Sequence, residues 1–294
     1  MPRQSRQAKM EQMRQSLYSG QLTPQQYLQK ETRQARLPKG EVKTTMRPAT
    51  LDDISLMVGE RGIILGMTRV GKSTLAERLV DTWTNTIPRS RTVILDSKPR
   101  FKAERQLNGL SAAPLYRNWD WGVTIPRSVV IPMDNPQSEL RLAWSLGYRV
   151  VIAQIHKRSD IKKLDDVLQA AYEGRKKNYP LFFYVDELNN FFRSGQAAGN
   201  GIVMAITSGG ERSTAFLGAA QRPRWISVEA IESMTKLYWF YTPYGEDVKH
   251  LKSMGVPSTA RPPDQYYTFY FFDRLSMKQG MCRVAPMPHK KGEK

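Results

Sequence analysis

Cysteine, histidine and long apolar runs are scarce in this chain of 294 residues. Its one cysteine, Cys282, has no partner for an internal disulfide, which fits a reducing compartment. The three histidines are far apart and lack the spacing of metal ligands. No apolar run approaches the ~20 residues of a membrane-spanning helix, and the first residues lack the apolar core of a signal peptide. We therefore expect a soluble protein without a transmembrane segment that is not secreted.

Acidic residues are also few. Asp and Glu total 27 against 45 Lys and Arg, which gives a formal net charge of +18 and a sequence pI near 10.0. An excess of this size indicates a polyanionic partner, most simply nucleic acid. The alternative at this point is a basic soluble protein whose charges are only solvated.

The clearest motif lies between Gly62 and Thr74. Residues Gly66 to Ser73 read GMTRVGKS and fit the phosphate-binding pattern G-x-x-x-x-G-K-[ST]. The apolar run from Ile63 to Leu65 precedes the motif, as a buried strand would, and apolar residues at helical spacing follow it. This context predicts a strand, a phosphate loop and a helix, and therefore ATP binding.

Each residue type of this loop has a physical task. Gly66 and Gly71 let the backbone bend so that its N–H groups point at a phosphate, and the helix that starts near Lys72 adds its positive end. Lys72 can reach the β- and γ-phosphates, and the Ser73 hydroxyl can hold Mg²⁺. We expect nucleotide contacts from Gly66, Thr68, Arg69, Val70, Gly71, Lys72, Ser73 and, at the α-phosphate, Thr74.

Two further strands end in residues suited to hydrolysis. The run from Leu181 to Val185 is followed by Asp186, a candidate Mg²⁺ ligand through water, and Glu187, a candidate base for the attacking water. The run from Ala215 to Ala220 is followed by Gln221, which could sense the γ-phosphate by hydrogen bonding. The alternatives are an ordinary strand that ends in surface acids and a polar turn residue.

The rest of the pattern predicts an α/β fold, with a mostly parallel sheet flanked by helices. Further strands are expected over 91–96, 128–132, 149–155 and 237–241, with helices over 159–176, 202–211 and 248–254. The aromatic run 266–272 is expected to be an edge strand or a subunit contact, or to stack on bases. We divide the chain into a basic, Gln- and Arg-rich helical arm (1–50), a phosphate-loop ATPase core (51–260) and a C-terminal extension with a basic tail (261–294).

Taken in order, these motifs resemble the HerA/FtsK family of DNA-translocating ATPases. The resemblance covers roughly residues 59–241 and rests on the phosphate loop, Asp96-Ser97-Lys98, Asp186-Glu187, and Gly210-Glu211-Arg212 followed by Gln221-Arg222-Pro223. Family members carry a Gly-Arg pair, whereas Glu211 separates the two residues here. The resemblance implies a RecA/FtsK-like fold, a homo-oligomeric ring of five or six subunits around double-stranded DNA, and Arg212 as a finger on a neighbour's nucleotide, with Arg222 and Arg224 as rivals.

Within that family, the chain is most similar to the genome-packaging ATPases of double-stranded-DNA viruses. We expect it to lack the membrane anchor of the chromosome-segregation translocases, the N-terminal β-barrel of the HerA proteins and a nuclease region. The resemblance therefore implies packaging into a preformed capsid, with a capsid vertex or portal protein as partner, in the host cytoplasm or virion. The alternatives are an assembly ATPase like those of filamentous phages and a small-molecule kinase built on the same loop.

Overall fold

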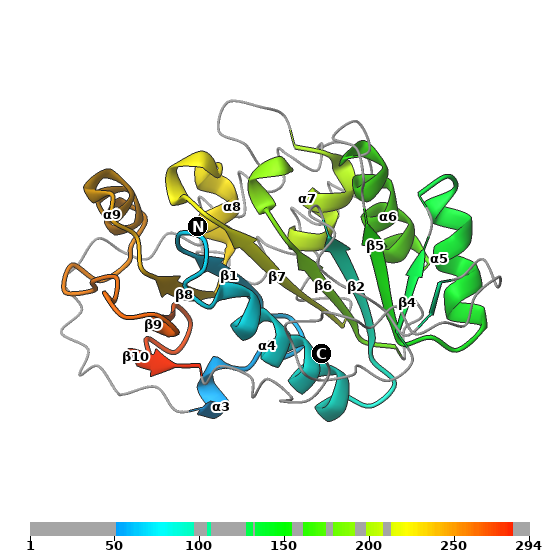
Figure 1. Cartoon of the computed structure of the whole chain (residues 1–294), viewed down its shortest axis with the longest axis horizontal. Coiled ribbons are helices and arrows are strands. Elements are labelled where there is room, and N and C mark those ends of the chain that lie inside the picture. The colour runs from blue at the N-terminus through cyan, green and yellow to red at the C-terminus, as the bar shows by residue number, and fades with distance from the viewer. Residues whose placement is uncertain are drawn as a thin grey trace, which may run out of the picture.

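The structure is a computed structural model that describes residues 51–96, 105–106, 128–131, 133–154, 161–174, 179–191, 198–207 and 213–284. Within these ranges, ten strands form one sheet in the order β10-β9-β8-β1-β7-β6-β2-β5-β4-β3 (Figure 1). The strands are β1 (Arg61–Leu65), β2 (Arg91–Asp96), β3 (Arg105–Gln106), β4 (Ser128–Ile131), β5 (Val150–Gln154), β6 (Leu181–Val185), β7 (Thr214–Ala220), β8 (Lys236–Phe240), β9 (Thr268–Asp273) and β10 (Gln279–Arg283).

Strands β1 to β8 run parallel to one another, whereas β9 runs antiparallel to β8 and β10 antiparallel to β9. The central strands are short apolar runs, and every residue of β1, β6, β7 and β8 is buried. Such runs suit strands that are covered on both faces. The mostly parallel α/β sheet expected from the sequence is therefore confirmed.

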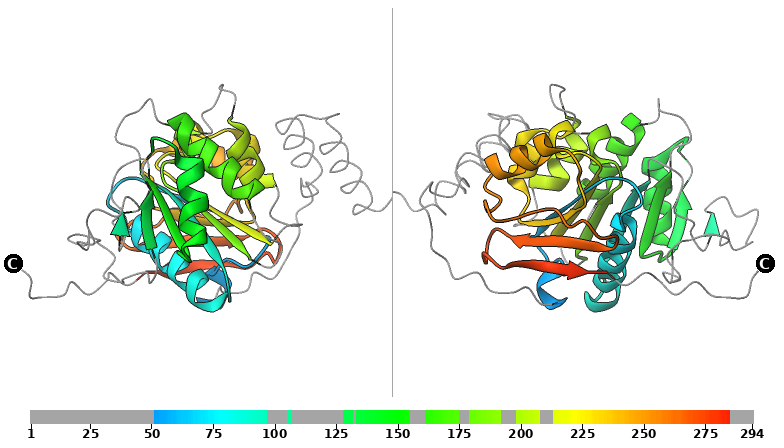
Figure 2. Two further views of the ribbon diagram at one scale, coloured as in Figure 1. Left: turned by 90° about the vertical axis from the view of Figure 1, so that its right-hand side faces the viewer. Right: turned by 60° about the vertical axis from the view of Figure 1, so that its left-hand side comes forward.

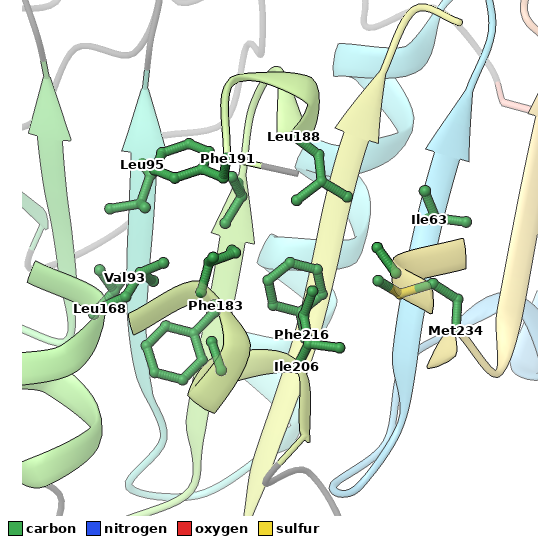
Figure 3. Packing of buried hydrophobic residues seen from close by; sticks show 14 of the residues in the cluster. Ile63, Val93, Leu95, Leu168, Phe183, Leu188, Phe191, Ile206, Phe216 and Met234 are labelled. Carbon is green, nitrogen blue, oxygen red and sulfur yellow. The ribbon is translucent and has the colours of Figure 1, made fainter. Parts of the chain in front are cut away.

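Helices cover both faces of the sheet (Figures 1 and 2). One face packs against α4 (Lys72–Thr86), and the other packs against α5 to α9. Figure 3 shows Phe183 and Phe216 in the second of these layers, with Ile206 of α7 beside them. The remaining helices are α3 (Leu51–Ile54), α5 (Pro136–Ser145), α6 (Ile161–Glu173), η2 (Leu188–Asn190), α7 (Asn200–Thr207), η3 (Pro223–Trp225), α8 (Val228–Ser233) and α9 (Gly245–Ser253).

The expected central strands are observed within one or two residues of their predicted bounds, and α6 lies inside its predicted range. The prediction that 266–272 is an edge strand is wrong. β9 lies between β8 and β10 and is buried throughout, and β10 forms the edge of the sheet. The patterns did not predict α5, α8 or β10, which are short or only partly apolar.

Several predicted features lie outside the described residues. These are the arm at 1–50, Ser97 and Lys98, Arg212, and the basic tail from residue 285. The proposed division into arm, core and extension stays a prediction, although β9 and β10 continue the sheet of the core. Among the described helices, none combines the length and the apolar character needed to cross a membrane.

Candidate nucleotide site

The phosphate loop leaves the carboxyl end of β1, between the ends of β7 and β8. The Gly66 amide donates a hydrogen bond of 3.3 Å to the Ala220 carbonyl at the end of β7. The Met67 amide donates one of 3.1 Å to the Tyr241 carbonyl, which follows β8. The start of the loop is therefore tied to both neighbouring strands, at the edge where ligands gather in open α/β sheets.

Two glycines let the loop turn in this narrow space. Gly66 has a φ of 146° and Gly71 a φ of 107°, which are values that residues with a side chain rarely adopt. A Cβ on Gly66 would lie 2.6 Å from Phe240 Cβ, and one on Gly71 would lie 2.8 Å from Tyr267 Cδ1. Met67, Thr68 and Arg69 are exposed between them. The two motif glycines are therefore required by geometry as well as by pattern.

Positive charge gathers where the loop enters α4. The Lys72 Nζ donates hydrogen bonds of 2.7 Å to the carbonyls of Gly66 and Met67, so its ammonium lies against the inside of the loop. Ser73 and Thr74 lie in the first turn of α4, which holds no acidic residue. The first N–H groups of a helix have no partner within the helix, so this turn can bind an anion.

The two acidic candidates follow β6. The side chain of Asp186 lies on the α4 face of the sheet, because it shares that face with Tyr184, whose hydroxyl is 3.4 Å from Asp186 Oδ1. Both acids are largely buried, with Asp186 5% exposed and Glu187 8% exposed. Glu187 has a φ of 55°, which is uncommon for a residue with a side chain and marks a fixed backbone at this point.

Gln221 contacts Glu187 and follows the strand residue that binds the start of the loop. Its Nε2 donates a hydrogen bond of 2.8 Å to Glu187 Oε1. The preceding residue, Ala220, is the one whose carbonyl accepts the Gly66 amide. Glu187 and Gln221 therefore lie at the carboxyl ends of the strands, which is the edge of the sheet that carries the phosphate loop. This position is compatible with a role at the nucleotide.

Two residues of this region were not among the predicted site residues. Asp96, at the end of β2, is fully buried, and its Oδ2 accepts a hydrogen bond of 3.0 Å from Gln154 Nε2. β2 pairs with β6, so Asp96 lies beside Asp186. The sequence signal that could have identified Asp96 is its place at the end of an apolar strand. The other residue is Tyr267, whose amide donates a hydrogen bond of 2.9 Å to the Val70 carbonyl, and no local pattern indicates this contact.

Two of the three candidate finger arginines are held within their own chain. Arg222 Nε lies 3.0 Å from Asp247 Oδ2, and the guanidinium carbon of Arg222 lies 3.8 Å from the centre of the Tyr244 ring. Arg224 forms an ion pair with Glu246. The third candidate, Arg212, lies outside the described residues.

The donors fit a magnesium ion that arrives with a nucleotide. Among the described residues, no group of three or more His, Cys, Asp and Glu side chains could hold a metal. Mg²⁺ is commonly bound by one or two carboxylates together with substrate phosphates and water. The Ser73 hydroxyl at the start of α4 and the Asp186 carboxylate on the same face of the sheet match that limited set.

No protein-family model matches this sequence, and no curated protein matches it either. The fold, however, has counterparts among solved structures. The genome packaging NTPase B204 from Sulfolobus turreted icosahedral virus 2, in complex with ATP-gammaS, matches with a TM-score of 0.53 and 12% identity, over 77% of this chain and 98% of that chain.

The DNA-packaging ATPase B204 from Sulfolobus turreted icosahedral virus matches with a TM-score of 0.53 and 15% identity, over 78% of this chain and all of that chain. EssC (ATPases 2 and 3) from Geobacillus thermodenitrificans gives a TM-score of 0.48 at 11% identity. It covers 80% of this chain and 41% of that one, and we base no argument on it. At these identities the likeness shows the fold alone: the chain shares the mostly parallel, helix-flanked α/β fold of the NTPase B204.

Proposed function

We propose that this protein is an ATP-hydrolysing motor that moves double-stranded DNA, and that it packages a viral genome into a preformed capsid. The observation that carries the hydrolase assignment is the 2.8 Å hydrogen bond between Gln221 and Glu187 at the edge of the sheet that holds the phosphate loop. An aligned carboxylate beside a triphosphate is what a base for water attack requires.

The roles of the individual residues follow from their chemistry. The loop backbone from Thr68 to Thr74 binds the phosphates, and Lys72 moves from the loop carbonyls to the β- and γ-phosphates. Ser73 and Asp186 would hold Mg²⁺, which would supply positive charge beside the phosphates. Glu187 orients and deprotonates the attacking water, and Gln221 keeps Glu187 aligned and senses the γ-phosphate.

The motor assignment rests on charge and on fold. The net charge of +18 suits a partner whose backbone is a chain of phosphates. B204, whose fold this chain shares, is described as a genome packaging NTPase and as a DNA-packaging ATPase. A ring of five or six subunits around the duplex would place Arg212 on the nucleotide of a neighbour, where a cation of this kind can be worth ~10³–10⁵ in rate. The ring would act at a capsid vertex or portal, in the host cytoplasm or on the virion.

The test is ATP turnover with and without DNA. We expect double-stranded DNA of unrelated sequences to stimulate hydrolysis equally, because contacts to phosphates carry no sequence information. The stimulation should fall steeply with salt, since each released counterion contributes to the slope. Turnover that no DNA changes would contradict the motor assignment.

The same assay separates the two alternatives. Stimulation by single-stranded DNA but not by duplex would favour an assembly ATPase of the filamentous-phage type. Phosphate transfer that appears only when a metabolite acceptor is added would favour a small-molecule kinase.

A further inference from the structure

Tyr267 lies against the phosphate loop, on the side away from Glu187 and Gln221. Its amide donates a hydrogen bond of 2.9 Å to the Val70 carbonyl, and its ring is so close to Gly71 that a Cβ there would lie 2.8 Å from Cδ1. The Val284 amide donates a hydrogen bond of 2.8 Å to the Tyr267 carbonyl. The backbone of Tyr267 is therefore fixed to the loop on one side and to the chain that follows β10 on the other.

The backbone of Tyr267 is in an uncommon conformation, with a φ of 61°. This conformation costs free energy for a residue with a side chain. Residues in such conformations are common at ligand sites, where the surrounding structure holds them in place. Tyr267 is half-buried, and the residues just before it, Asp264, Gln265 and Tyr266, are exposed. Part of the ring therefore packs on the loop, while the segment just before it lies at the surface.

The order of the strands sets the direction of a bound nucleotide. β7 and β8 flank β1 on opposite sides. Gln221 and Glu187 follow β7 and β6, so in the proposed function the reacting γ-phosphate would point toward that side. The sugar and base of the same nucleotide would then leave the loop toward β8 and β9, and Tyr267 directly precedes β9.

We propose that the ring of Tyr267 is the surface on which the base of the bound nucleotide stacks. This inference rests on the proposed function, because it needs a nucleotide in the loop. A tyrosine ring is suited to the task, since every base has an aromatic face and stacking does not depend on its hydrogen-bonding edge. Tyr267 would thereby favour nucleotides over other polyphosphates and position the triphosphate along the loop.

The experiment compares two ligands on the full chain by titration calorimetry. One is ATP, and the other is ribose 5′-triphosphate, which is ATP without its base. Base stacking on an aromatic side chain is typically worth a factor of ~5–150 in affinity. On the unaltered protein we expect ATP to bind more tightly than ribose 5′-triphosphate by a factor in this range, and equal affinities would overturn the proposal.

The variants then assign the difference to Tyr267. Tyr267→Leu should weaken ATP binding by a factor of ~5–150 and leave ribose 5′-triphosphate unchanged, whereas Tyr267→Phe should keep the affinity for ATP. The matched control is Tyr148→Leu, which alters another half-buried tyrosine that precedes β5, an interior strand in the half of the sheet away from β9. If Tyr267→Leu lowers the affinity for ATP and for ribose 5′-triphosphate equally, or lowers neither, the ring does not stack on the base.

A failure of the proposed function gives a different result. Lys72→Ala should lower the affinity for both ligands, because both carry the triphosphate. If Lys72→Ala binds ATP and ribose 5′-triphosphate as the unaltered protein does, the loop is not the phosphate site, whatever the Tyr267 variants show.

Discussion

Gln221 Nε2 donates a hydrogen bond of 2.8 Å to Glu187 Oε1, although the two residues follow different strands. β7, which ends at Ala220, lies between the strand of the phosphate loop and the strand that delivers Glu187. Gln221 therefore stands between the loop and the carboxylate. A change at the γ-phosphate that moves Gln221 would also move the candidate base.

Gln221→Leu should lower the turnover number while ATP affinity stays close to that of the unaltered protein. Leucine keeps the bulk of the side chain but cannot donate to Glu187, and a misplacement of about 1 Å in a catalytic group can cost about 10²-fold. Steady-state ATP hydrolysis and equilibrium binding measure the two effects. Gln169→Leu, on α6, serves as the control. A turnover number unchanged in Gln221→Leu would remove Gln221 from the mechanism.

Gly66→Ala and Gly71→Ala should each abolish tight ATP binding. Alanine at these positive φ values is strained by roughly 1–3 kcal/mol, and its Cβ would also meet Phe240 or Tyr267 at less than a normal contact distance. Gly245→Ala is the matched control, because a Cβ at this first position of α9 meets nothing within 4 Å. Wild-type ATP affinity in either loop variant would show that the observed loop geometry is not the one that binds.

Arg222→Ala should destabilise the fold far more than Arg224→Ala. Arg222 neutralises Asp247, whose side chain is fully buried, so its loss leaves a buried charge without its partner, at a cost of roughly 3–5 kcal/mol. Arg224 and Glu246 form an exposed pair, which is worth about 0–1 kcal/mol. Urea denaturation of the two variants measures the difference. Equal stabilities would mean that the Arg222–Asp247 pair does not support α9.

Cys282 should react slowly with thiol reagents at pH 8. Burial, and to a lesser degree the negative charge of Asp53, raises the pKa of the Cys282 thiol above its ordinary value. Because the thiolate is the reactive form, less of it is present at a given pH than in a free thiol, and the rate should rise with pH to a midpoint above the ordinary one. The release of thionitrobenzoate from Ellman's reagent reports this single thiol, with free cysteine as the reference. A rate at pH 8 equal to that of free cysteine would contradict the raised pKa.

Local patterns were sufficient for the centre of the sheet. β1, β2, β6 and β7 are short apolar runs, which is why the sequence pattern predicted them. Each is followed by the phosphate loop or ends at or just before a polar residue, and these positions indicated the candidate site. The Gly66–Ser73 motif added the position of the loop. Parallel strands bring their carboxyl ends to one edge, which is why Glu187 and Gln221 could be expected there.

Features that depend on tertiary packing could not be read in this way. The position of Tyr267 beside Gly71 depends on β9 pairing with β8, and the aromatic run alone did not distinguish an interior strand from an edge strand. The partnership of Arg222 with Asp247 likewise depends on where α9 packs. The left-handed backbone of Glu187 has no sequence signal, because glutamate is not a residue that favours it.

The most direct measurement of the central claim is ATP turnover and ATP binding in Glu187→Gln. Glutamine keeps the size of the side chain but cannot accept a proton, so hydrolysis should fall by ~10²–10⁴-fold while ATP affinity is retained. Glu173→Gln, an exposed change in the last turn of α6, should leave both unchanged. If Glu187→Gln hydrolyses ATP at the rate of the unaltered protein, the carboxylate that Gln221 aligns is not the catalytic base, and the assignment of this site is wrong.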